Sequence, residues 1–497
     1  MKIKNIFRIM ILFVAALFIQ SCSDDDNVNR ATGLDVTLDE AEVSSIAFPV
    51  TASYRLICIH TDGTWNVSIP DADTTWLHVT PHEGYGRGIY KSVSDSLNTY
   101  VRISVDKNEG ETKSSTITVT AGSYSKTISV VQAGSALTDS HESSFEFVAN
   151  AKLGYNLGNT LDSDPGNADW FVSKLAACTT SADSIAAYET SWGQPVTTQK
   201  MIDDIHAAGF NVIRVPVTWG PHLDANNKIS KAWMDRVEEI VKYVIKDSCY
   251  CIINVMHDTG TDGWCYADVD DYSAITLKYQ TIWKQIAERF KDYDNHLIFE
   301  SFNEILNKKY SWTAPDAGDG AYTAINKLQQ DFVNTVRATG GNNLYRNLGI
   351  TTYAATANAD APVNALSVPN DVVSGHIYAT FHSYDPYNFC NNNSEKNADG
   401  TYKYDYNIKV WDSSCEATVD DVFKRVGKKC NALGIPYIYG EFGAIDENKN
   451  MNERVKYATY LAGKFKEYKT TGLWWMGLYD RKTNKWYEDE LVKALFK

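Results

Sequence analysis

The feature that most constrains the fold is an alternation of short apolar runs with longer helical patterns across residues 145–497. Amphipathic stretches, such as 233–245 and 275–290, separate the runs, and this βα rhythm requires parallel strands covered by helices. Eight such units over roughly 350 residues predict an α/β fold, a (β/α)8 TIM barrel. The eight runs are 153–157, 212–217, 251–255, 297–302, 344–351, 377–381, 437–439 and 473–476.

Residues 34–134 have a different rhythm of short β segments between turns, for example at 101–105 and 127–131. This spacing predicts a small all-β, Ig-like sandwich ahead of the barrel. Trp65 and Trp76 lie within its strand-like patterns, which favours core packing over sugar binding. The polar stretch 135–144 lacks an apolar period and is the predicted linker to the second domain, 145–497.

The first residues have the layout of an export signal. Basic residues precede an apolar run at 9–19, which is shorter than the ~20 residues that span a bilayer. The run ends at Ser21 and Cys22, so 1–21 is a predicted signal peptide and 22–33 a tether. Cys22 resembles the acylated cysteine of bacterial lipoproteins, and the acidic residues after it resemble an outer-membrane export tether. We expect a lipoprotein anchored at Cys22 on the outer membrane and facing the cell surface; cleavage without lipid is the alternative.

The charge and the cysteines exclude other classes. A net charge of -15 repels phosphate backbones, so no nucleic-acid partner is expected. The eight cysteines after Cys22 show no metal-ligand spacing, so we expect buried thiols and no metal. The 13 Trp and 30 Tyr suit sugar binding, although most must pack in the cores of so large a protein.

Polar and aromatic side chains gather where the apolar runs end. In a barrel these ends converge on one face, where active sites are built. One polar residue there has little meaning, whereas several at successive strand ends indicate a site. They are Arg214, His257, Asn303, Glu304, His382, Tyr384, Glu441, Trp474 and Trp475.

Two carboxylates in this set suit hydrolysis of a glycosidic bond. Retention of configuration needs an acid to protonate the leaving oxygen and a nucleophile about 5–5.5 Å away. Glu304 and Glu441, on the fourth and seventh runs, are the predicted acid/base and nucleophile. The supporting roles predicted for their neighbours are these: Asn303 bonds the sugar 2-OH, His382 and Tyr384 orient protons and the nucleophile, and Arg214 keeps Glu441 ionised.

Motifs along the catalytic half resemble glycoside hydrolase family 5, within the subfamily rich in endo-β-1,4-glucanases and xyloglucanases. They lie at 154–162, 189–195, 210–217, 299–304, 382–389 and 440–443. The resemblance implies a retaining endo-acting hydrolase without a cofactor, acting on cellulose-like, mixed-linkage or xyloglucan chains. Segments at 65–67, 76–81, 107–108 and 131–134 resemble a BACON domain, here interpreted as a spacer between the lipid and the catalyst.

Two departures from the family pattern concern the walls of the site. Met256 precedes His257 where the family usually has a His-His pair, and the sequence at 474–478 replaces the usual Trp-Trp-Asp-Asn-Gly. We therefore expect altered affinity or subsite preference. The alternatives are a β-mannanase or glucomannanase, and a surface glycan-binding lipoprotein that has lost catalysis. Under each of these hypotheses we expect a monomer, because attachment through lipid makes self-assembly unnecessary.

The position of each aromatic residue in the pattern predicts whether it binds sugar or packs in the core. Trp475, at a strand end, is the strongest candidate for a sugar-stacking platform. Trp192, directly after the predicted long loop 160–191, and Trp264, in the predicted long loop 259–273, are further candidates. Trp233 and Trp283 lie within helical periods and are predicted to pack in the core.

Overall fold

The computed structural model describes residues 31–38, 41–48, 52–86, 99–108, 110–134, 141–390, 410–445, 451–475 and 477–497. The predicted signal peptide, Cys22, most of the tether, residues 135–140 of the linker and Met476 lie outside the described residues. Among the helices that are described, none is long and apolar enough to cross a membrane.

The N-terminal domain has two five-stranded sheets, ordered β2-β1-β4-β8-β6 and β3-β10-β9-β5-β7. Alternate residues of each strand face the space between the sheets, as Val101, Ile103 and Val105 do on β8. Trp65 and Trp76 are buried in this core, as predicted. The strands are β1 Leu34–Leu38, β2 Ala41–Glu42, β3 Ser45–Phe48, β4 Ser53–Thr61, β5 Thr64–Ser68, β6 Leu77–Thr80, β7 Glu83–Tyr85, β8 Thr99–Val105, β9 Lys113–Ala121 and β10 Tyr124–Gln132.

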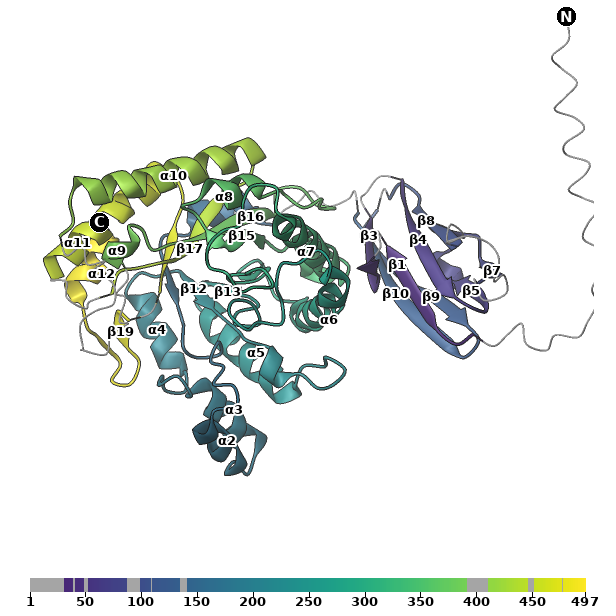
Figure 1. Ribbon diagram of the computed structural model, residues 1–497, viewed down its shortest axis with the longest axis horizontal. Helices are drawn as coiled ribbons and strands as arrows, with labels where there is room; N and C mark the ends of the chain where they lie inside the picture. The colour runs from purple at the N-terminus through teal and green to yellow at the C-terminus, as the bar shows by residue number, and fades with distance from the viewer. Residues whose placement is uncertain are drawn as a thin grey trace, which may run out of the picture.

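The second domain is a closed parallel barrel of eight strands wrapped by helices, which confirms the predicted fold class (Figure 1). Its strands are β11 Gly154–Asn156, β12 Val212–Val215, β13 Tyr250–Ile253, β14 Leu297–Glu300, β15 Leu348–Thr356, β16 Ile377–Ser383, β17 Tyr437–Phe442 and β18 Gly472–Trp475. The helices that follow them include α4 Gln199–Ala207, α5 Lys231–Ile245, α6 Tyr272–Phe290, α7 Gly320–Arg337, α8 Asp360–Ala365, α10 Ser413–Leu433 and α11 Met451–Glu467. Trp233, on α5, and Trp283, on α6, are fully buried, as expected.

Two predictions about elements were wrong. The fifth strand begins at Leu348 rather than at Leu344, because Gly341–Leu344 forms the short helix η4. Between η4 and the strand, the buried guanidinium of Arg346 donates to the backbone carbonyls of Phe290 and Leu297. The segment 160–191 is not only loop: it contains helices α2 Asp169–Ala176 and α3 Ser181–Glu189. Each helix is only eight or nine residues long, and α3 is rich in Ala and Ser, so neither gave a clear apolar period.

The N-terminal end of the barrel is closed by the helix that follows the linker, α1 Ser144–Asn150. Phe147 packs edge-on against Tyr250 and Tyr378 at centroid distances of 5.0 and 5.4 Å. The two domains also touch: β3 and β2 of the sandwich contact α7 and α6, the two helices that face the sandwich in Figure 1.

Smaller elements complete the chain. The hairpin of β19 Tyr479–Asp480 and β20 Lys485–Trp486 follows the last barrel strand and leads into α12 Asp489–Leu495. Three further short helices are η1 Asp71–Asp73, η3 Gly220–His222 and α9 Tyr387–Cys390. Every described cysteine except Cys178 is buried, as expected.

Candidate active site

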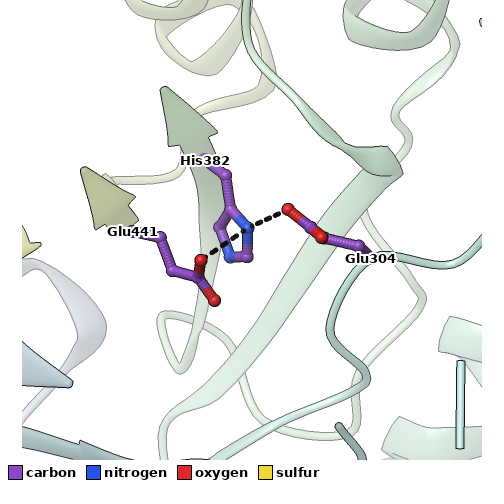
Figure 2. Close-up of side chains that lie close together, drawn as sticks. All are labelled: Glu304, His382 and Glu441. Carbon is purple, nitrogen blue, oxygen red and sulfur yellow. Dashed lines mark hydrogen bonds and ion pairs between the residues drawn. The ribbon is translucent and has the colours of Figure 1, made fainter. Parts of the chain in front are cut away.

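The two predicted carboxylates meet at the C-terminal ends of the barrel strands. Glu304 lies in the loop after β14, and Glu441 is on β17 (Figure 2). His382, on β16, lies between them: its Nδ1 is 2.7 Å from Oε1 of Glu304 and 3.6 Å from Oε2 of Glu441. One oxygen of each carboxylate lies within 4.8 Å of the other. This proximity fits the close pair of a retaining glycosidase better than the wider pair of an inverting one.

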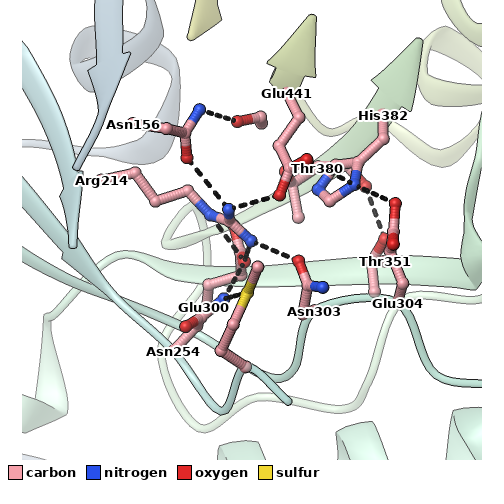
Figure 3. Close-up of polar contacts among 12 residues, drawn as sticks. Asn156, Arg214, Asn254, Glu300, Asn303, Glu304, Thr351, Thr380, His382 and Glu441 are labelled. Atoms are coloured by element: carbon pink, nitrogen blue, oxygen red, sulfur yellow. Dashed lines mark hydrogen bonds and ion pairs between the residues drawn. The ribbon is translucent and has the colours of Figure 1, made fainter. Parts of the chain in front are cut away.

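Arg214 holds the floor of the site from β12 (Figure 3). The guanidinium is fully buried, and Nη1 donates to Oε1 of Glu441 at 2.8 Å and to Oδ1 of Asn156 at 3.0 Å. Nη2 donates to Oε1 of Glu300 at 2.6 Å and to Oδ1 of Asn303 at 2.8 Å. Arg214 therefore fixes the nucleophile candidate and orients Asn303, whose amide N–H groups remain to donate to a ligand.

Opposing effects set the ionisation of the pair. Burial raises the pKa of Glu441, and the nearby Glu304 adds to the rise, whereas His382, Arg214 and a hydrogen bond from Tyr384 oppose it. The Tyr384 hydroxyl donates to Oε2 of Glu441 at 2.9 Å. Burial lowers the pKa of His382, but Glu441 and Glu304 outweigh it, so that this pKa lies above its usual value. The two carboxylates therefore favour the protonated form of His382, and Arg214 favours the ionised form of Glu441.

Glu304, His382 and Glu441 are also the one group in the described parts of the chain whose ligand atoms are close enough to hold a metal ion. The Arg214 cation lies 2.8 Å from Glu441 and opposes a divalent cation at this place. The chemistry that this set of side chains favours is general acid–base catalysis by one carboxylate and nucleophilic attack by the other.

The aromatic candidates differ in what they can offer. Trp475 is half-buried, and its ring covers Gly158 so closely that a Cβ there would lie 2.7 Å away. Trp192 packs edge-on against His257 at 5.1 Å. Trp264 donates to Asp258 at 2.6 Å and has the Lys278 ammonium 4.1 Å from its ring centroid, so that cation occupies part of its surface. Beside Trp475 and Tyr384 lies a cavity of about 800 Å³, large enough for sugar units.

Met256, at the position where the family usually has a histidine, lies against Asn254. Its side chain is buried, and its sulfur accepts from Nδ2 of Asn254 at 3.8 Å. The same amide donates to Glu300 at 3.0 Å. Met256 therefore lies beside the group that supports Glu300. Of the altered segment 474–478, Trp474 is buried against Phe442 in the core, so it offers no platform.

Three polar residues of this network were not singled out from the sequence: Asn156, Asn254 and Glu300. Each lies in or just beyond an apolar run and is fully buried, and each is bonded directly or indirectly to Arg214. A charged residue inside an apolar run, such as Glu300 in 297–302, was the available signal. A buried charge requires a partner, and Arg214 supplies it.

A parallel barrel whose C-terminal face carries this carboxylate pair defines a barrel glycosidase, and comparison with known proteins identifies the family. The model of the cellulase family, glycosyl hydrolase family 5, matches residues 175–479, and the BACON model, a putative N-terminal binding domain, matches 64–133. The chain belongs to glycoside hydrolase family 5 and is an endoglucanase.

Individual relatives agree with this assignment. The chain is 35% identical to endoglucanase A of Ruminococcus albus over 377 residues, which cover 71% of this chain and 92% of that protein. It is 28% identical over 530 residues, covering 100% of this chain and 96% of the other, to a xyloglucan-specific endo-β-1,4-glucanase of Bacteroides ovatus. A broad-specificity endoglucanase from Ruminococcus champanellensis, solved with bound cellotriose, superposes with a TM-score of 0.63 at 35% identity, covering 72% of this chain and all of that one.

Proposed function

We propose that the enzyme cleaves internal β-1,4-glucosidic bonds with retention, using Glu441 as nucleophile and Glu304 as acid/base. The observation that carries this proposal is the approach of the two carboxylates to within 4.8 Å, each with its own partners. Glu441 is bonded to Arg214 and Tyr384, which hold its oxygens for attack. Glu304 is bonded to His382 and is about a quarter exposed, which suits a group that exchanges protons with substrate and water.

In the first step, Glu304 gives its proton to the glycosidic oxygen while Glu441 attacks the anomeric carbon. The bond to the leaving sugar breaks, and a covalent glycosyl-enzyme forms. Positive charge develops on the sugar ring in the transition state. The Asn303 amide, oriented by Arg214, is placed to bond the 2-OH at that moment, when such bonds strengthen.

In the second step, Glu304, now a carboxylate, takes a proton from water, and the resulting hydroxide attacks the same carbon. The ester to Glu441 breaks, which returns both residues to their first state and restores the β configuration. The Arg214 and Tyr384 hydrogen bonds stabilise Glu441 as it leaves with negative charge.

The proposed substrates are chains with a β-1,4-glucan backbone: cellulose-like, mixed-linkage or xyloglucan. The names of its relatives support this range, since they include a broad-specificity endoglucanase, a lichenase and a xyloglucan-specific enzyme. The aromatic ring of Trp475 suits the apolar face of an uncharged sugar, and the two charged residues that line the adjoining cavity, Arg454 and Glu488, are paired with each other.

An assay of one purified sample on carboxymethylcellulose, lichenan, xyloglucan and mannan, with binding measured in parallel, tests the proposal. We expect cleavage of at least one of the three glucans, and NMR of the first product should show the β anomer. An inverted product contradicts the role of Glu441. Exclusive cleavage of mannan supports the mannanase alternative, and binding without cleavage supports the non-catalytic one.

We further propose that the protein is attached to the outer membrane through acyl chains on Cys22, with the BACON domain as a spacer. The basic, apolar and small residues ahead of Cys22 support this proposal. Labelled palmitate should enter the wild-type protein but not Cys22→Ser, and only the wild type should fractionate with outer membranes. Equal labelling of both proteins contradicts it.

A further inference from the structure

A buried carboxylate outside the catalytic pair faces one of the predicted sugar-binding residues. Asp162, in the loop after β11, is fully buried, and its oxygens accept from the backbone N–H of Thr160 at 2.6 Å and of Asn159 at 3.0 Å. Oδ2 lies 3.9 Å from Nε2 of His257, in the loop after β13. Burial raises the pKa of Asp162, and the charge on His257 opposes that rise.

The separation between these two residues is fixed by the surrounding contacts. The Thr218 hydroxyl donates to the carbonyl of Asp162 at 2.8 Å and accepts from the backbone N–H of His257 at 3.2 Å, so it joins the two loops. Arg481, buried in the turn of the β19–β20 hairpin, donates to Oγ1 of Thr160 at 2.5 Å and to the carbonyl of Gly158. The loop after β12 and the β19–β20 hairpin therefore both hold the loop at 158–162.

The same loop touches both predicted sugar contacts on this side of the site. Gly158 lies under the ring of Trp475, where a Cβ would be only 2.7 Å from it. His257 has 35% of its side chain exposed and packs against the edge of Trp192. A shift of the loop would therefore move His257 and Trp475 together.

We propose that Asp162 is a positioning residue that selects the tautomer of His257. A carboxylate facing Nε2 favours the proton on that nitrogen, which leaves Nδ1 of the neutral ring as an acceptor. In the described part of the chain, Nδ1 of His257 has no hydrogen-bond partner. It is the atom that accepts from a hydroxyl of the bound β-glucan, and this last step rests on the proposed function.

Asp162→Asn tests the proposal, because it removes the charge and keeps one oxygen to accept from the backbone N–H of Thr160, at the cost of the bond from Asn159. We expect KM for the preferred glucan to rise about fivefold, the worth of one ordinary hydrogen bond, with kcat changed less than twofold. In a His257→Ala background the same substitution should leave KM unchanged. Asp164→Asn, which alters a half-buried carboxylate two residues further on, is the matched control and should leave KM unchanged.

A rise in KM of the same factor in the His257→Ala background overturns the proposal, because Asp162 would then act by shaping the loop alone. Nitrogen-15 NMR of the ring supplies a readout that needs no substrate. The wild type should show protonated Nε2 and unprotonated Nδ1, and Asp162→Asn should show a mixture of tautomers. Identical ring spectra overturn the proposal even if the enzyme proves active, whereas the expected spectra in an inactive protein would reject the proposed function alone.

Discussion

The two ends of the barrel interior are built from the same strands but carry different side chains, apolar at one end and charged at the other. At the N-terminal end, an apolar cluster around Phe147 closes the barrel. At the C-terminal end, Arg214 lies among Glu300, Glu441 and Asn303 with all its hydrogen bonds made to side chains of the site. One end stabilises the fold and the other assembles charges.

The apolar side chains at the N-terminal end form one layer and the polar side chains at the C-terminal end form another, and the two layers are two residues apart along the strands. Because side chains alternate between faces of a strand, a residue and the second one after it both point inward. Val212, Ile252, Ile298 and Tyr378 belong to the apolar layer, and Arg214, Asn254, Glu300 and Thr380 follow them toward the site. A step of two residues, ~7 Å along a strand, separates packing from chemistry.

The largest effect should come from the nucleophile. Glu441→Ala should lower kcat by about 10⁴-fold, because no covalent intermediate forms without the carboxylate. Arg214 keeps its pair with Glu300, so the fold should survive. Initial rates on the preferred glucan and thermal unfolding measure both quantities. Activity within tenfold of wild type would contradict the assignment of Glu441 as the nucleophile.

Loss of the general acid should be smaller and should depend on the substrate. Glu304→Ala should lower kcat on a glucan by about 10²–10⁴-fold, since the leaving sugar then departs unprotonated. On an aryl glycoside whose leaving group needs no proton, the glycosylation step should be nearly normal, as seen in a burst of released phenol. An equal loss of that burst contradicts the assignment.

Glu300 tests whether the polar layer also carries stability. Glu300→Gln leaves Arg214 with one carboxylate, so we expect unfolding to become easier by about 3–5 kcal/mol and kcat to fall by at least tenfold as Asn303 and Glu441 lose their fixed partner.

The matched control for Glu300 is Glu189→Gln, which breaks a buried pair with Arg236 away from the carboxylates. It should destabilise the protein by a similar amount with kcat unchanged. If both variants lose activity equally, Glu300 serves stability alone. Denaturant unfolding and steady-state kinetics are sufficient for both proteins.

The smallest effect on activity should come from the opposite end of the barrel. Phe147→Ala opens a cavity under α1 and should lower the free energy of unfolding by about 3–5 kcal/mol. Below the unfolding transition, kcat and KM should stay within twofold of wild type. A fall in the kcat of Phe147→Ala at these temperatures would show that the apolar and polar layers are coupled, and would contradict their separate roles in stability and catalysis.

Much of the site could be predicted because strand ends converge in any parallel barrel. The positions of Glu304, His382 and Glu441 in the sequence were sufficient to expect them together, and their atoms do meet. The role of Asp162 could not be predicted, because its partner His257 is on another loop and their separation depends on Thr218 and Arg481. Helices α2 and α3 were missed because short, weakly amphipathic segments give no clear period.

The sequence by itself determined the βα rhythm, the sandwich before it and the family motifs, since each is a local pattern of apolar and polar residues. Only the tertiary structure decided which inward residue of each strand joins which layer. Register between strands sets this, and register depends on the closure of the whole sheet. The same closure made Glu300 the partner of Arg214, and placed Met256 beside Asn254, which donates to Glu300.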